Sequence, residues 1–131
     1  PERVLAAAAR LSHRDPSVAR ILPALIWKHR DRLDPDRLVT EARRQGEKQA
    51  LGFFVEMAAE LGGDPSLARW AEPLRDRRVR SRRDFFHRSR SPHARRLAEL
   101  HTPPAARRWH YLLNIGTDSF EAAFRRHVRT R

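Results

Sequence analysis

The 131-residue chain contains no cysteine and only two lysines. Without cysteine it can form no disulfide, no thiolate nucleophile and no cysteine-ligated zinc or iron–sulfur centre. Long hydrophobic runs are also missing: the longest, Ile21–Trp27, is far shorter than the roughly 20 residues of a membrane-spanning helix. No signal peptide is visible at the start, and the chain opens at Pro1 without methionine, as a fragment or a processed product would. We expect a cytoplasmic protein with no membrane partner.

The motifs of common enzymes are absent as well. The sequence has no GxxxxGK[ST] or GxGxxG loop, no GxSxG elbow and no HExxH pair. Asp84 and His87 stand three residues apart, but no second pair joins them as a metal site would require. Glu56 and Glu60 lie one helical turn apart, which is more typical of a solvated helix edge than of a metal site. We therefore predict no metal, no cofactor and no catalytic residue.

One enzymatic alternative stays open. Arginine and histidine separated by four to six residues resemble the motif of helical ribonucleases of the HEPN class. Because arginine is abundant in this chain, such spacings also arise by chance. The residue after each arginine is not the Asn, Asp or His that the class favours. Three pairs have the spacing: Arg82 with His87, Arg88 with His93, and Arg96 with His101.

Positive charge is concentrated in the second half of the chain. Residues 1–72 carry 12 Lys and Arg against 11 Asp and Glu, a net charge of +1. Residues 73–131 carry 16 Arg against 5 Asp and Glu, a net charge of +11. Within this half, Arg75–Arg96 holds ten arginines against Asp76 and Asp84. Such an asymmetry is typical of proteins that bind a polyanion such as nucleic acid.

Repeated helix-start signals predict the fold class. Asp15, Asp34 and Asp64 each precede a proline, which places a capping carboxylate before a residue that needs no N–H donor at the first helical position. The pairs Ser91-Pro92 and Thr102-Pro103 repeat this pattern with hydroxyl caps, and Asp118–Glu121 resembles a capping box. No alternating β-branched stretch indicates a strand. The sequence therefore predicts an all-α protein.

Apolar residues recur at helical spacing along most of the chain, for example Leu51, Val55 and Ala58 before the Gly62-Gly63 stop. Trp27, Trp70 and Trp109 have Leu or Ile neighbours at the same spacing, which favours packing in the core. We predict one compact helical domain of about six helices over residues 1–131, with a near-neutral body at 1–72 and an Arg-rich basic half at 73–131.

The stretch Leu33–Gly63, LDPDRLVTEARRQGEKQALGFFVEMAAELGG, resembles a helical region of bacterial nucleotidyltransferase-like proteins, some of which are toxins of toxin–antitoxin systems. The family's catalytic pattern, a Gly-Ser pair followed by paired aspartates, has no counterpart here, so no catalytic residue is carried over. The resemblance implies an accessory helical domain or a stand-alone relative. It rests on structural positions: Leu33, Asp34, Leu38, Ala42, Gly46, Ala50, Leu51, Gly52 and Leu61.

The sequence thus favours a non-enzymatic nucleic-acid-binding protein whose arginines contact phosphates. The alternative is a helical protein–protein interaction module, antitoxin-like or part of a larger complex, whose arginines meet an acidic partner. DNA or RNA, sequence specificity and oligomeric state stay open. The candidate binding residues are the arginines of the densest stretch: Arg77, Arg78, Arg80, Arg82, Arg83, Arg88, Arg90, Arg95 and Arg96.

Overall fold

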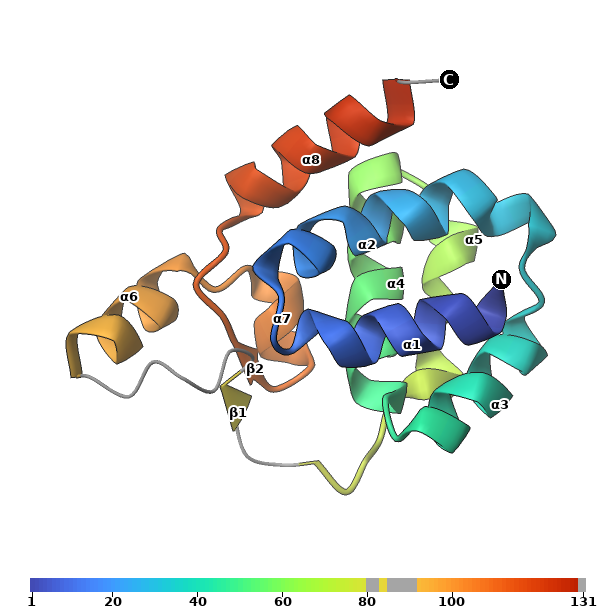
Figure 1. Cartoon of the computed structure of the whole chain (residues 1–131), viewed down its shortest axis with the longest axis horizontal. Helices are drawn as coiled ribbons and strands as arrows, with labels where there is room; N and C mark the ends of the chain where they lie inside the picture. Colours follow the sequence, from blue (N-terminus) through green and yellow to red (C-terminus); the bar gives the residue numbers. More distant parts are fainter. Residues whose placement is uncertain (80–82, 85–91, 130–131) are drawn as a thin grey trace.

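The computed structural model describes residues 1–79, 83–84 and 92–129 (Figure 1). The predicted all-α class is confirmed, and six of the helices in these residues are ten or more residues long. The elements are α1 (Glu2–Ser12), α2 (Pro16–His29), η1 (Arg30–Arg32), α3 (Pro35–Gln45), α4 (Lys48–Gly62), α5 (Pro65–Ala68), η2 (Glu72–Leu74), β1 (Arg83–Asp84), α6 (Pro92–His101), α7 (Pro104–Arg108), β2 (Tyr111–Leu112) and α8 (Thr117–Arg129).

The three Asp-Pro helix starts form as predicted. The carboxylates of Asp15, Asp34 and Asp64 each accept a hydrogen bond from the backbone N–H two residues on, at 2.9–3.0 Å. Two later starts differ from the prediction. The Thr102 hydroxyl does not cap α7 but bonds to the backbone of Leu113, and α7 begins at Pro104. Helix α8 begins at Thr117, so Asp118 lies within its first turn instead of capping it.

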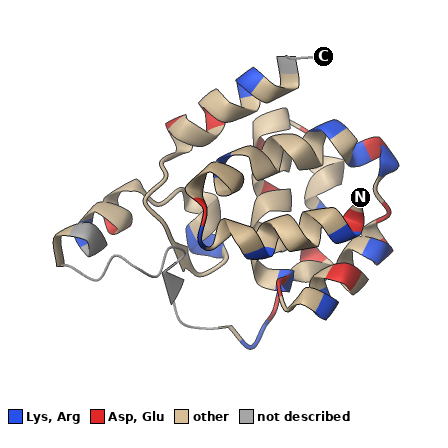
Figure 2. Cartoon of the chain, viewed as in Figure 1, with Lys and Arg blue, Asp and Glu red and all other residues tan. Residues whose placement is uncertain are grey.

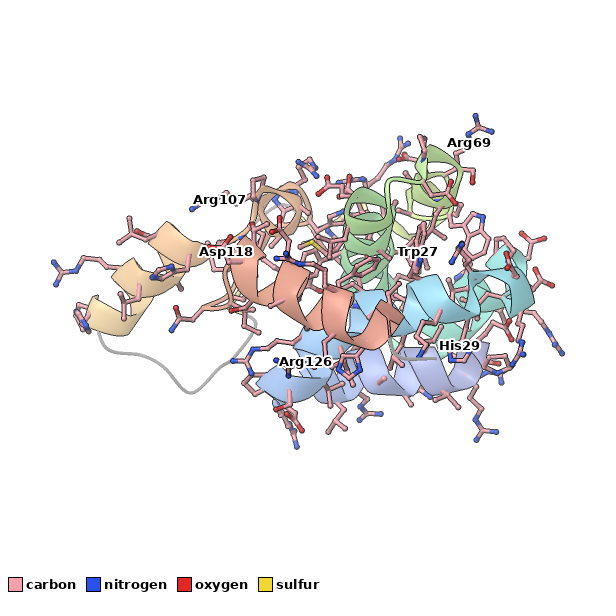
Figure 3. The ribbon with its side chains drawn as sticks, turned by 90° about the horizontal axis from the view of Figure 1, so that it is seen from above. Trp27, His29, Arg69, Arg107, Asp118 and Arg126 are labelled. Carbon is pink, nitrogen blue, oxygen red and sulfur yellow. The ribbon has the colours of Figure 1, made fainter. Side chains whose placement is uncertain are left out.

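Helix α4 forms the centre of the molecule, with α1, α2, α5 and α7 around it (Figure 1). Helix α8 lies along α2, and its Phe124 meets Trp27 of α2 while its Phe120 meets Phe53 of α4. The core therefore contains residues from both halves of the chain. The side chain of Trp27 points into the body, whereas that of Arg69 extends away from it (Figure 3).

The indole of Trp109 is fully buried against α4, which confirms its predicted place in the core. A Cβ atom added at Gly52 would lie 2.4 Å from this indole ring, so only glycine permits the approach. Because Trp109 directly follows α7, this contact holds the end of α7 against α4.

Two features lie outside the packing of helices around α4. Strands β1 and β2 pair in parallel, with Arg83 opposite Tyr111 and Asp84 opposite Leu112. Each strand is only two residues long, and so short a pairing needs no alternating pattern in the sequence. Helix α6 projects from the body (Figure 1), and Leu100 on it is 79% exposed.

Candidate nucleic-acid interface

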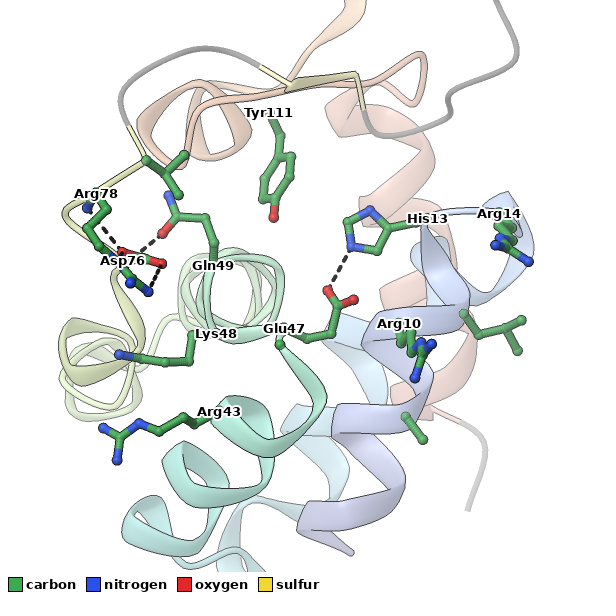
Figure 4. A pocket seen from close by; sticks show the side chains of 14 residues that line it. Arg10, His13, Arg14, Arg43, Glu47, Lys48, Gln49, Asp76, Arg78 and Tyr111 are labelled. Carbon is green, nitrogen blue, oxygen red and sulfur yellow. Dashed lines mark hydrogen bonds and ion pairs between the residues drawn. The ribbon is translucent and has the colours of Figure 1, made fainter.

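A cleft of about 690 Å³ opens where the last residues of α1 and α3 meet the first residues of α4 (Figure 4). The segment that follows η2 forms another wall of this cleft, and buried Tyr111 also lines it. Its lining includes two carboxylates and five Lys or Arg side chains. We call it the basic cleft and define it by these cations: Arg10, Arg14, Arg43, Lys48 and Arg78.

Helix ends place most of these cations. Arg10 lies in the last turn of α1 and Arg43 in the last turn of α3, where a positive charge is favourable against the negative end of the helix dipole. Gly46 then adopts a left-handed conformation, with φ of 72°, and turns the chain directly into α4. Lys48, the first residue of α4, is thereby brought beside Arg43 in the lining of the same cleft.

Both carboxylates of the cleft already have partners. Glu47 meets His13 at 2.8 Å, a contact that joins the start of α4 to the end of α1. Asp76 accepts hydrogen bonds from the backbone N–H and the guanidinium of Arg78, at 3.0–3.2 Å. The Arg78 side chain, its backbone N–H and, to a smaller extent, Lys48 hold the pKa of Asp76 below its usual value. Both carboxylates of the cleft are therefore already engaged within the chain, Glu47 by His13 and Asp76 by Arg78.

Four cations of the cleft have no such partner. In the described part of the chain, the side chains of Arg10, Arg14, Arg43 and Lys48 form no hydrogen bond and no ion pair. In Figure 4, Arg43 and Lys48 extend to the same side, below the Asp76–Arg78 pair. The cleft thus combines a positive excess with donors that a bound anion could use.

The segment carrying Arg77 and Arg78 is fixed to the core at its start. The buried amide of Gln49 donates to the carbonyl of Trp109 at 2.9 Å and accepts from the backbone N–H of Asp76 at 2.8 Å. The guanidinium of Arg75 lies over the Trp109 ring, 4.2 Å from its centroid, and donates a hydrogen bond of 3.0 Å to the backbone carbonyl of Arg108. Because of these contacts, the Arg-rich stretch begins at the rim of the basic cleft.

A smaller hollow of about 330 Å³ adjoins the basic cleft. The two share Gln49, Asp76 and Val79 in their walls, and the smaller one adds Arg75 and Arg77. The basic surface therefore continues from the ends of α1 and α3 into the stretch that the sequence singles out.

The structure brings only part of the predicted binding set to this surface. Arg78 lines the basic cleft and Arg77 the adjoining hollow; both side chains are strongly exposed, and Arg77 forms a long ion pair of 3.8 Å with Glu72. Arg96 is exposed on α6 and lines neither. Arg83 belongs to β1 and Arg95 to α6. Four predicted residues lie outside the described residues: Arg80, Arg82, Arg88 and Arg90.

The features weighed for catalysis do not assemble a site in the described residues. Arg108 forms ion pairs with Glu56 and Glu60, and the Trp109 indole donates to Glu56, so this carboxylate pair holds α7 against α4. Across residues 1–79, 83–84 and 92–129, no group of three or more His, Asp or Glu could hold a metal ion. Of the three Arg–His pairs with ribonuclease-like spacing, only Arg96 with His101 lies wholly within the described residues. Both side chains are exposed, and neither lines the basic cleft.

No helix among the described residues is long and apolar enough to cross a membrane.

The charge pattern along the sequence does not single out Arg10, Arg14, Arg43 or Lys48. They lie in the near-neutral half of the chain, where 11 acids offset 12 Lys and Arg and no dense run of cations stands out. Figure 2 shows both signs of charge over α1 and α3, so composition alone hides the cluster. The one available signal is position, because Arg10 and Arg43 each stand at a helix end.

The chain matches no family model, no curated protein and no solved structure. The resemblance of residues 33–63 to nucleotidyltransferase-like proteins therefore stays a prediction. The positions that carry it have structural roles here: Leu38 and Ala42 are buried in α3, Gly46 ends that helix, and Gly52 admits Trp109. The basic cleft is left as the feature from which function is inferred.

Proposed function

We propose that this protein binds nucleic acid through phosphate contacts, without catalysing a reaction. The observation that carries the proposal is the basic cleft, in which four cations without a hydrogen-bond or ion-pair partner among the described residues adjoin the start of the Arg-rich stretch. Arg77 and Arg78 connect the two regions. Arg80, Arg82, Arg88 and Arg90 belong to the proposal on the sequence alone, as do Arg83 and Arg95.

Electrostatics supports an anionic ligand. Like charges gathered in one concave surface repel one another, and a bound anion relieves that repulsion. Arginine presents a planar set of donors that matches a phosphate, and lysine adds a compact charge. Each phosphate neutralised by such a side chain releases counterions, so binding weakens as salt rises.

The test is the affinity for labelled DNA and RNA oligomers, single- and double-stranded, over a salt series from about 50 to 300 mM. We expect the plot of log K against log[salt] to have a slope equivalent to about five or more phosphates. A preference for one form of nucleic acid would identify the ligand class. A shallow slope without preference would contradict the proposal.

Two matched double variants locate the contacts. Arg43→Gln with Lys48→Gln removes two cations from the basic cleft. Arg20→Gln with Arg69→Gln removes two exposed cations elsewhere that form no hydrogen bond or ion pair in the described part of the chain. If both cleft cations contact phosphates, the first variant lowers the salt slope by about 1.4 to 1.8, and the control leaves it unchanged. Equal slopes for the two variants would place the contacts outside the cleft.

An acidic protein partner is the second candidate. It is favoured by Leu100, an exposed apolar side chain on projecting α6, the helix that also carries exposed Arg96. This candidate predicts only weak oligomer binding that does not grow with oligomer length. The salt series therefore separates the two candidates before any partner is sought.

A further inference from the structure

We infer that the basic cleft receives a terminal phosphate of a nucleotide, either the phosphorylated end of a nucleic acid strand or a free nucleotide. This inference deepens the proposed function and rests on it for the strand-end form. It uses only described residues of α1, α3, α4 and the segment after η2.

The charge of the cleft matches a terminal phosphate better than an internal one. Five Lys or Arg side chains face two carboxylates, and both carboxylates are engaged by His13 and Arg78. An internal phosphodiester carries a single negative charge, whereas a terminal phosphate carries about −1.5 to −2 at neutral pH and offers three acceptor oxygens. A compact group with this charge can use several donors from one cleft at once.

The shape of the cleft also favours a strand end or a free nucleotide. Its volume of about 690 Å³ lies in the range of small-molecule pockets, which is about 300–1,000 Å³. A passing duplex would need an extended groove, whereas a nucleotide can enter a hollow of this size. Ala7, Leu11 and Val79 supply apolar surface in the same lining, against which a sugar or base can pack.

Arg43 and Lys48 are the side chains we expect to touch the phosphate. They come from adjacent helix ends joined by the tight turn at Gly46, and they extend to the same side of the cleft (Figure 4). Neither has an intramolecular partner to give up in the described part of the chain. Binding there therefore breaks no existing ion pair.

The experiment compares single-stranded oligomers that differ only at their ends, at one fixed salt concentration. The set has a 5′-phosphate, a 3′-phosphate or hydroxyls at both ends. A hydroxyl-ended oligomer two nucleotides longer serves as the control for total charge, because two phosphodiesters add at least as much negative charge as one terminal phosphate. Nucleoside mono- and triphosphates and inorganic phosphate are titrated separately to distinguish a strand end from a free nucleotide. Affinity is measured by fluorescence anisotropy for oligomers and by calorimetry for the small anions.

We expect one terminal phosphate to tighten oligomer binding by about tenfold or more, which one additional charge-assisted hydrogen bond can supply. The Arg43→Gln, Lys48→Gln variant should lose this gain, and the Arg20→Gln, Arg69→Gln control should keep it. Unchanged helical circular dichroism and melting temperature in both variants would exclude misfolding as the cause.

The other outcomes separate this inference from the proposed function. Equal affinity for phosphorylated and hydroxyl-ended oligomers would overturn the terminal phosphate and leave nucleic-acid binding standing. Binding of a nucleoside triphosphate alone, lost in the cleft variant, would support the phosphate site and overturn nucleic-acid binding. No binding of oligomers or small anions would overturn both.

Discussion

Two groups of charged side chains lie at the amino end and along the side of α4, and they differ in how they are engaged. Along the side, Arg108 pairs with Glu56 and Glu60, and the Trp109 indole donates to Glu56. At the amino end, Arg43 and Lys48 line the basic cleft with no partner in the described residues. The first group holds the fold together, whereas the second is available to a ligand. The first group balances an arginine against two carboxylates, whereas the second is two cations without an ion-pair partner in the described residues.

The largest effect is expected at the engaged group. Replacing Trp109 by alanine removes a fully buried indole, its hydrogen bond to Glu56 and the ring beneath Arg75. We expect the free energy of unfolding to fall by about 3–5 kcal/mol, as for other buried aromatic side chains. Urea denaturation measures this loss. Trp70→Ala, which removes a partly buried indole, should cost less, and equal costs would contradict the central place given to Trp109.

Gln49 joins the engaged group to the rim of the cleft, so its loss should affect both. In Gln49→Ala the carbonyl of Trp109 and the N–H of Asp76 lose their partner. Each buried backbone group left without a hydrogen bond costs about 1–3 kcal/mol unless water replaces the amide. We expect a lower melting temperature and faster amide hydrogen exchange at Asp76. Gln45→Ala on α3 is the control, and an equal shift there would refute the link.

Acid should weaken the hydrogen bond of another engaged carboxylate, that of Glu2. Glu2 is almost fully buried and accepts the N–H of Asp34 at 2.9 Å, a bond that lowers its pKa from the ordinary value of 4.5. Because the native pKa is the lower one, the stabilisation is present above pH 4.5 and is lost as the pH falls through the native value. The melting temperature of Glu2→Gln should therefore fall less on acidification than that of the original chain. Parallel pH profiles would contradict this.

Single substitutions of Arg108 and Arg43 should have the smallest effects on stability, and they compare an engaged arginine directly with one that has no partner in the described residues. Arg108→Gln breaks two partly exposed ion pairs and should cost about 0.2–1 kcal/mol, without changing nucleic-acid affinity. Arg43→Gln breaks no ion pair among the described residues and should leave stability within about 0.5 kcal/mol while weakening binding. Denaturation and anisotropy on these two single variants measure both quantities. Equal losses of affinity would show that engagement does not separate the two groups.

Much of the fold could be predicted from the sequence because its signals are local. The carboxylates of Asp15, Asp34 and Asp64 cap the helices that begin at the next residue, and this depends only on neighbours in the chain. Thr102 has the same local signal, yet its hydroxyl bonds to Leu113, because packing of the chain after α7 offers it a partner. The pairing of β1 with β2 likewise depends on tertiary contacts alone.

The candidate site could be predicted only where its charge is dense along the chain. Arg77 and Arg78 belong to the Arg-rich stretch; Arg78 lines the basic cleft and Arg77 lines the smaller hollow beside it. Arg10, Arg43 and Lys48 come from three helices and meet through the packing of α1 and α3 against α4. Arg10 lies more than 30 residues before the other two in the sequence, so the cluster becomes visible only in three dimensions.

The position of α8 has a consequence for how the chain folds. Phe120 meets Phe53 and Phe124 meets Trp27, so the last helix covers side chains synthesised much earlier. Contacts between residues far apart in sequence slow folding, because a long loop must close before they form. During translation, α2 and α4 leave the ribosome with these aromatic side chains uncovered. Until α8 follows, the nascent chain presents the apolar surface that chaperones bind and that promotes aggregation.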